Sequence, residues 1–151
     1  MRLRFSRTTD YGLRAALEVA RAADGQLVTR HAIAHATGAP ASVIAQPLAA
    51  LVRAGLLAAH AGPLGGYRLS RPARDISIHD VVAAVRGEGR EERCVLHEGV
   101  CSQQEACPFH AVLETAQQRF LDTLRAASLA DVLGAEAGAR PARGDGPSPP
   151  P

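Results

Sequence analysis

Three cysteines and a histidine lie close together in the second half of the sequence. Cys94, Cys101 and Cys107 are the only cysteines of the chain, in the spacing C-x6-C-x5-C, and His110 follows three residues after the last. Thiolates bind soft metal centres, and iron–sulfur clusters are held mainly by cysteine. The spacing is wider than the C-x2-C pairs of most zinc sites, and an odd number of thiols does not suit a disulfide scaffold. The pattern therefore predicts a [2Fe–2S] or [4Fe–4S] cluster bound by the three cysteines.

A cluster of either kind usually takes four protein ligands, so another residue must complete this set. His97, Glu98 and His110 lie nearby in the sequence, and Asp10 is a distant candidate that a partner subunit would supply. An oxygen or nitrogen ligand at a soft site would be exchangeable and would let a small molecule enter. We interpret His97 and Glu98 as solvated loop residues. His110 remains open between ligation and capping or exposure on a helix, and Asp10 stays a candidate.

Two other interpretations of the thiols differ in chemistry. The first is a regulator without a cluster, in which the cysteines form a zinc site with one histidine or act as a thiol switch. The second is a redox enzyme with a nucleophilic cysteine, supported only by His97 close to Cys94. Because no phosphate loop or substrate site is recognisable, we expect that the protein is not an enzyme.

Charge divides the chain into two unlike halves. Residues 1–74 contain ten arginines and three acidic residues, a net charge of +7, whereas residues 75–151 contain seven arginines and twelve acidic residues, a net charge of −5. All the basic residues are arginine. A basic half joined to an acidic half indicates a polyanionic partner, such as double-stranded DNA, for the first half only.

The basic half has the element order of a winged helix. Residues 8–23 read as a first helix capped by Thr8 or Thr9, and residues 28–57 read as two short helices separated by a glycine-containing turn, the helix-turn-helix pattern. Residues 58–72 flank a Gly-Pro and Gly-Gly tip and predict a β-hairpin. The sequence therefore predicts a mainly α fold with a small hairpin wing. Its low aromatic content of 3% agrees with a helical core of Ala, Leu and Val.

The second half continues with helices around the cysteines. Ser77, with Asp80 three residues later, predicts a capped helix near residues 75–88, and a long helix should run from Pro108 to Ala127. Its apolar face exceeds what a small winged helix can cover and therefore indicates a homodimer interface; this face consists of Val112, Ala116, Phe120, Leu124 and Ala127, widened by Leu113 and Leu121. A short helix should restart at Ser128.

Three regions follow from this organisation. Residues 1–75 form a winged-helix DNA-binding region, residues 76–134 hold a helix, the cysteine loop and the dimerisation helix, and residues 135–151 form a tail rich in Gly, Ala, Pro and charge that we expect to be disordered. No apolar run approaches the ~18 residues of a membrane span, and the first residues lack a signal-peptide core. We therefore expect a cytoplasmic protein.

Candidate DNA contacts come from the second helix of the helix-turn-helix, residues 42–54, which should enter the major groove. Ser42, Val43 and Gln46 stand at its N-terminal end, where a glutamine pairs bidentately with adenine. Pro47 inside this helix predicts either a kink or a later start. The remaining candidates are placed to contact phosphates or to form the wing: Arg30, Arg53, His60, Gly65, Gly66, Tyr67 and Arg68.

Taken in order, the segments TTDYGLRA, SVIAQPLAALVRAGLL, GPLGGYRLSRP, ISIHDVVAAV, the three cysteines and LADVL resemble a bacterial family of winged-helix iron–sulfur regulators. The family includes the iron–sulfur cluster assembly repressor and the nitric-oxide-sensing repressor. The resemblance, over about residues 1–134, implies a homodimer with crossed long helices and one cluster per subunit on Cys94, Cys101 and Cys107. It implies His110 as the fourth ligand by analogy with the assembly repressor, or Asp10 from the partner by analogy with the nitric-oxide sensor.

This resemblance implies a DNA-binding regulator, expected to be a repressor, whose operator affinity a cluster controls in response to nitric oxide, redox state or iron–sulfur status. Two departures bear on the DNA contacts. Ala61-Gly62 stands in the wing where many members have Arg-Gly, and Ala45 stands where an acidic residue is common early in the recognition helix. The family therefore does not define the operator sequence of this chain.

Overall fold

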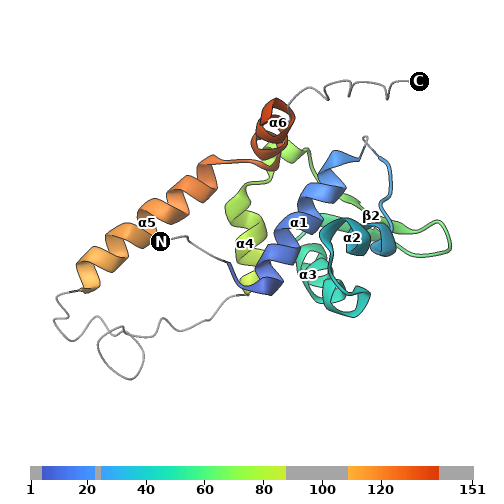
Figure 1. The fold of residues 1–151 in the computed structure, drawn as a ribbon, viewed down its shortest axis with the longest axis horizontal. Helices are drawn as coiled ribbons and strands as arrows, with labels where there is room; N and C mark the ends of the chain where they lie inside the picture. The colour runs from blue at the N-terminus through green and yellow to red at the C-terminus, as the bar shows by residue number, and fades with distance from the viewer. Residues whose placement is uncertain (1–4, 23–24, 88–108, 140–151) are drawn as a thin grey trace, which may run out of the picture.

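A computed structural model describes residues 5–22, 25–87 and 109–139, and its elements follow the predicted order (Figure 1). Within these ranges the chain is mainly helical with one two-stranded antiparallel hairpin, which confirms the predicted fold class. The elements are α1 (Arg7–Arg21), α2 (Arg30–Thr37), α3 (Ala41–Arg53), β1 (Leu57–His60), β2 (Gly66–Leu69), the 3-10 turn η1 (Ala73–Asp75), α4 (Ile78–Arg86), α5 (His110–Ala126) and α6 (Leu129–Ala139).

A single apolar core joins α1, α2, α3, α4 and the start of α6. Ile33, Ile44, Leu51 and Val81 are fully buried there, and Leu129 of α6 is equally buried. Aliphatic side chains of this size each stabilise the fold by about 1.5–3 kcal/mol when removed from water. Because Leu129 belongs to the same core, α6 is a part of the winged-helix body.

The first helix begins one residue before the predicted caps. Ser6, in an extended conformation, is the N-cap, and its side chain accepts from the backbone N–H of Thr9 at 3.3 Å. The prediction of Thr8 or Thr9 as the cap is therefore wrong. Thr9 is buried in the first turn, and its hydroxyl lies 2.9 Å from that of Ser6. An apolar environment can hold this threonine because its hydroxyl keeps a hydrogen-bonding partner.

The recognition helix α3 is uninterrupted from Ala41 to Arg53 although it contains Pro47. It begins directly after Pro40, so the later start considered from the sequence is wrong. Pro47 has no backbone N–H to donate to the carbonyl four residues earlier, a loss of one helical hydrogen bond. Its ring is buried, and this burial compensates part of that cost.

The wing is a hairpin in which β1 pairs with β2 in the register Leu57–Leu69 and His60–Gly66. Gly62 and Gly65 close its tip, where the N–H of Gly65 donates to the carbonyl of Gly62 at 2.9 Å. The hairpin extends past α2 and α3, away from the body, in Figure 1.

Two similar serine caps connect α4 and α6. Ser77 and Asp80 form a capping box at the start of α4, as predicted, and Ser128 and Asp131 bond each other in the same way before α6. The two caps are linked by backbone hydrogen bonds from Ile78 to the carbonyl of Ala127 at 2.8 Å and from Leu129 to that of Ile76 at 2.9 Å.

The last two helices, α5 and α6, differ in how they lie relative to the body. α5 projects away from the body in Figure 1, and α6 lies against it. α6 continues to Ala139, five residues past Gly134, so the prediction of a disordered tail is wrong for residues 135–139. The alanines in this stretch favour a helix, and an ion pair between Glu136 and Arg21 of α1 attaches it to the body.

Candidate nucleic-acid interface

The N-terminal half of α3 exposes the side chains that were predicted to meet DNA bases. Ser42, Val43 and Gln46 are exposed, Val43 at 40%, whereas Ile44 and Leu48 on the opposite face are completely buried. The buried face fixes the helix on the core and so determines which side chains point outwards. The helix carries no charged residue before Arg53.

The three arginines predicted to contact phosphates lie on α2, α3 and β2. Arg30 stands at the start of α2, Arg53 in the last turn of α3 and Arg68 on β2; all three are exposed, and none forms an ion pair within the part of the chain that the structure describes. Guanidinium groups without acidic partners are available for phosphates.

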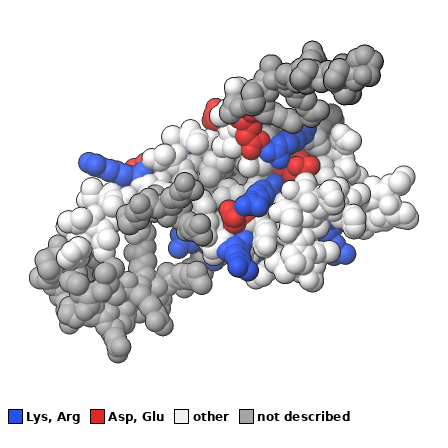
Figure 2. All heavy atoms as spheres, viewed as in Figure 1, with Lys and Arg blue, Asp and Glu red and all other residues white. Residues whose placement is uncertain are grey.

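On α1, in contrast, arginines are paired with acidic residues. Arg14 pairs with Asp10 and Arg21 with Glu18, each at 3.0 Å, so positive and negative side chains alternate there (Figure 2). Two of the three arginines of α1 are therefore paired with acidic residues of the same helix, whereas Arg30, Arg53 and Arg68 are not paired within the described ranges.

The predicted wing residues serve two purposes. Tyr67 is half-buried and exchanges two backbone hydrogen bonds of 2.9 Å with Val28, which attaches the wing to the segment before α2. Gly66 is buried, and a Cβ on it would lie 2.6 Å from the Val28 carbonyl oxygen. Gly66 thus permits a close backbone approach, while His60 is exposed at the end of β1.

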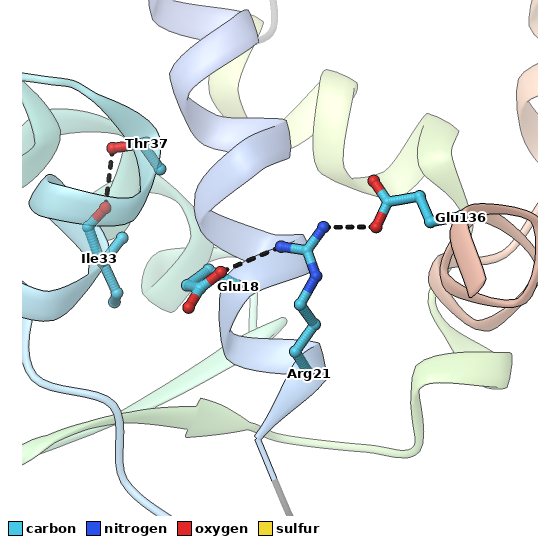
Figure 3. Close-up of polar contacts among 5 residues, drawn as sticks. All are labelled: Glu18, Arg21, Ile33, Thr37 and Glu136. Carbon is cyan, nitrogen blue, oxygen red and sulfur yellow. Dashed lines mark hydrogen bonds and ion pairs between the residues drawn. The ribbon is translucent and has the colours of Figure 1, made fainter. Parts of the chain in front are cut away.

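Polar contacts at the ends of α1 and α2 hold these elements in place (Figure 3). The hydroxyl of Thr37 is buried and donates to the carbonyl of Ile33 at 2.8 Å, just before the turn into α3. Arg21 links α1 to α6 through Glu136. Its hydrogen bond to that carboxylate is the main cause of the raised pKa of the Arg21 guanidinium. This long-range pair was not predicted, since neither residue alone signals a partner 115 positions away.

The predicted cluster ligands fall mostly outside the described residues. Cys94, Cys101 and Cys107 lie in residues 88–108, and of His110 only the position, as the first residue of α5, is described. Asp10 lies in the first turn of α1 and accepts from Arg14 at 3.0 Å. Among the described residues there is no group of three or more His, Cys, Asp or Glu side chains suited to a metal ion.

The side of α1 that adjoins the last turn of α4 is that of Gly12, where a Cβ would come within 2.5 Å of Cγ2 of Val85. Asp10, two residues earlier, lies on a different side of the helix. Since α4 ends at Arg86, the chain enters the cysteine-containing segment next to the first turns of α1.

A helix-turn-helix with an exposed N-terminal half of its second helix, followed by a hairpin, defines a winged-helix DNA-binding protein. The chain belongs to the Rrf2 family, described as iron-dependent transcriptional regulators, which it matches over residues 5–135. Regulators of this family bind DNA. The chain is accordingly a transcriptional regulator rather than an enzyme.

Individual relatives agree with this assignment. Over 85 residues, 56% of this chain, it is 36% identical to Rv1287 and to MT1325 of Mycobacterium tuberculosis, whose names describe HTH-type transcriptional regulators. The matched segment spans 53% of the length of these curated relatives.

Solved structures share the fold over nearly the whole chain. IscR from T. potens is 26% identical and superposes with a TM-score of 0.77, with 94% of each chain covered. CymR, described as the global cysteine regulator of B. subtilis, is 20% identical with a TM-score of 0.70, covering 89% of this chain and 98% of its own; it shows the fold alone. None of the helices in the described ranges combines the length and apolar character needed to cross a membrane.

Proposed function

We propose that this regulator binds operator DNA as a homodimer and that an iron–sulfur cluster on its cysteine segment controls the affinity. The observation that carries the DNA-binding part is the exposed end of α3. Gln46 offers a donor and an acceptor to adenine, Ser42 offers a hydroxyl, and Val43 offers a methyl surface to thymine. The uncharged N-terminal part of α3 reads bases, and Arg30 on α2 and Arg53 in the last turn of α3 contact phosphates.

The proposal of a homodimer is supported by the apolar surface of α5. Phe109, Val112 and Leu113 are 50%, 64% and 43% exposed within one chain. Only the second half of α5 contacts the body of the same chain. There the ring centroids of Phe120 and Phe5 are 6.1 Å apart. A second copy of α5 would remove the exposed side chains from water, and it would supply two recognition helices for a two-fold symmetric operator.

The donor set fits an iron–sulfur cluster. Cys94, Cys101 and Cys107 supply three soft thiolates, and His110 or Asp10 of the partner subunit completes the set. Asp10 lies in the first turn of α1, and its pairing with Arg14 is exposed and therefore easily exchanged. When bound, the cluster supplies a centre that reacts with nitric oxide or oxidants. The protein contributes the ligands and the connection to α4.

An alternative control uses the same cysteines as a thiol switch or a zinc site. It is supported by the shared fold with a regulator described by its response to cysteine. Anaerobic metal and sulfide analysis separates the two mechanisms, because iron with acid-labile sulfide cannot come from zinc or from free thiols.

The decisive experiment measures DNA affinity with and without the cluster. An operator is first selected from a random duplex pool with the full chain, and binding is then followed by fluorescence anisotropy for the reconstituted and the cluster-free protein. We expect affinities that differ ~5–150-fold between the two forms. Gln46→Ala should bind this operator ~5–150-fold more weakly, a cost of about 1–3 kcal/mol. Gln118→Ala, exposed on α5, is the matched control.

Salt dependence provides a second test of the same surface. With Arg30, Arg53 and Arg68 on each subunit neutralising phosphates, log K should fall against log salt concentration with a slope of about −5 for the dimer. If the full chain enriches no duplex from the pool, the DNA-binding proposal fails. If the two forms bind equally, cluster control fails and DNA binding stands.

A further inference from the structure

The tip of the wing carries one of the most exposed large apolar side chains of the described residues. Leu64 is 91% exposed, whereas the other leucines of the wing, Leu57 and Leu69, are buried or half-buried. A single exposed leucine is ordinary on a protein surface. What sets Leu64 apart is the construction of the turn that presents it.

This turn is rigid. Pro63 and Leu64 occupy its two central positions, closed by the 2.9 Å hydrogen bond from Gly65 to Gly62. Proline fixes the backbone of the first central residue. Gly62 has a φ of +110°, a region that disfavours side chains, and a Cβ on Gly65 would lie 2.2 Å from the carbonyl oxygen of His60. Leu64 is therefore held out at the end of the wing by its neighbours.

The charge of the wing lies on Arg68 of β2 and not at its tip. Between Ala41 and Tyr67 the only charged residue is Arg53, so the tip has no Arg or Lys. A tip of Gly, Pro and Leu offers no side-chain donor or acceptor to a base edge either. Whatever the tip contacts, it contacts through shape and apolar surface.

We infer that Leu64 inserts into the minor groove of the operator, beside the major-groove segment that α3 reads, and is a specificity-determining residue. The inference rests on the proposed DNA binding and adds a second contact to it. The hairpin is continuous with α3 through β1 and projects beyond it, so a duplex seated on α3 lies next to the wing (Figure 1). A minor groove of about 6 Å admits a single side chain on a narrow turn, and apolar side chains placed there act as wedges against base steps.

Such a contact selects DNA by deformability. Pyrimidine–purine steps unstack easily, whereas A-tracts are stiff. The operator should therefore contain a TA or CA step under each wing, and its replacement by an A-tract should weaken binding of the wild-type chain without weakening binding of Leu64→Ala.

The test uses the full chain, its selected operator and three variants of one exposed residue. Leu64→Ala should bind at least ~5-fold more weakly with an unchanged salt slope, since an apolar contact is lost and no charge changes. Leu64→Met should retain wild-type affinity. Leu64→Arg should steepen the slope by roughly 0.9 per subunit, because only a cation within reach of a phosphate releases counterions.

Thermal unfolding of all three variants should match the wild type, since Leu64 contributes almost nothing to the core. Equal operator binding by Leu64→Ala, or an unchanged slope for Leu64→Arg, overturns the inference while DNA binding by the wild-type chain stands. Unchanged DNA binding with altered transcription would show that the tip meets a protein, and would also overturn it. Failure of the wild-type chain to bind any duplex would overturn both the proposed function and this contact.

Discussion

Replacing Gly12 with alanine should destabilise the protein, although alanine is the better helix former. Gly12 is buried in α1, and a Cβ added there would lie 2.5 Å from Cγ2 and 3.3 Å from Cγ1 of Val85, and 3.4 Å from Cβ of Pro47. Valine in a helix has essentially one favourable rotamer, so Val85 cannot turn its methyl groups away without strain. The added methyl group must push α4 away from α1.

The magnitude follows from two opposing contributions. Alanine in place of glycine gains about 1 kcal/mol of helix propensity, and crowding a packed interface costs about 1–3 kcal/mol. We therefore expect Gly12→Ala to lower the free energy of unfolding by about 1 kcal/mol. For a body of this size that corresponds to a fall in Tm of about 4 °C.

A double-mutant cycle makes the cause measurable. Val85→Ala alone should cost about 1 kcal/mol by removing two methyl groups from a half-buried site. In the double variant the crowding is gone and the propensity gained by the Gly12→Ala substitution remains, so its stability should be close to wild type. The coupling free energy is then about −2 kcal/mol, well beyond the ~0.5 kcal/mol within which independent sites add.

Urea unfolding followed by circular dichroism gives all four stabilities under one condition. Additive effects of the two substitutions would refute the close approach of α1 and α4, and so would a Gly12→Ala variant more stable than the wild type. Changes in the m-value would indicate that a substitution altered the extent of unfolding rather than the contact.

Other predictions concern the helix ends and α5. Ser77→Ala should lower the stability of the body by about 1 kcal/mol in the same urea assay, because it removes the hydroxyl half of the α4 capping box. Leu113→Arg should shift the chain to monomer in sedimentation velocity, whereas Gln118→Arg on the opposite face should not. Hydrogen bonds from Ser128 lower the pKa of Asp131. The stability that the ionised carboxylate contributes is therefore complete above the ordinary aspartate pKa of about 3.9 and is lost as the pH falls below it. We expect the wild type to be more stable than Asp131→Asn at neutral pH and to lose this advantage in acid.

The parts of the fold that sequence alone predicts are those with local signals. Gly38, with a φ of +68°, ends α2, and the Ser77–Asp80 pair starts α4; both features act over three or four residues and are visible in the sequence. The exposed face of α3 follows for the same reason, since the spacing of Ile44 and Leu48 determines which side is buried.

The errors have a long-range origin. Ser6 is the N-cap instead of Thr8 or Thr9 because Thr9 is buried in the core. Its burial is determined by packing and not by the propensity of threonine to cap a helix. α6 continues past Gly134 because Glu136 meets Arg21 on another helix. An exposed pair of this kind contributes at most about 1 kcal/mol, enough to decide where an alanine-rich end stops but not enough to be read from a sequence.

Gly12 also shows how the two halves of the site are joined. A Cβ at this single position would contact Val85 in the last turn of α4 and Pro47 in the middle of α3, so three helices meet there. α4 leads into the segment that holds the cysteines, and α3 carries Gln46 next to Pro47. Pro47 lacks the hydrogen bond that would otherwise fix that turn of the recognition helix, so packing has a larger share in fixing its position there. The helix that carries Gln46 and the end of α4, which precedes the three cysteines, therefore both pack against α1 at Gly12.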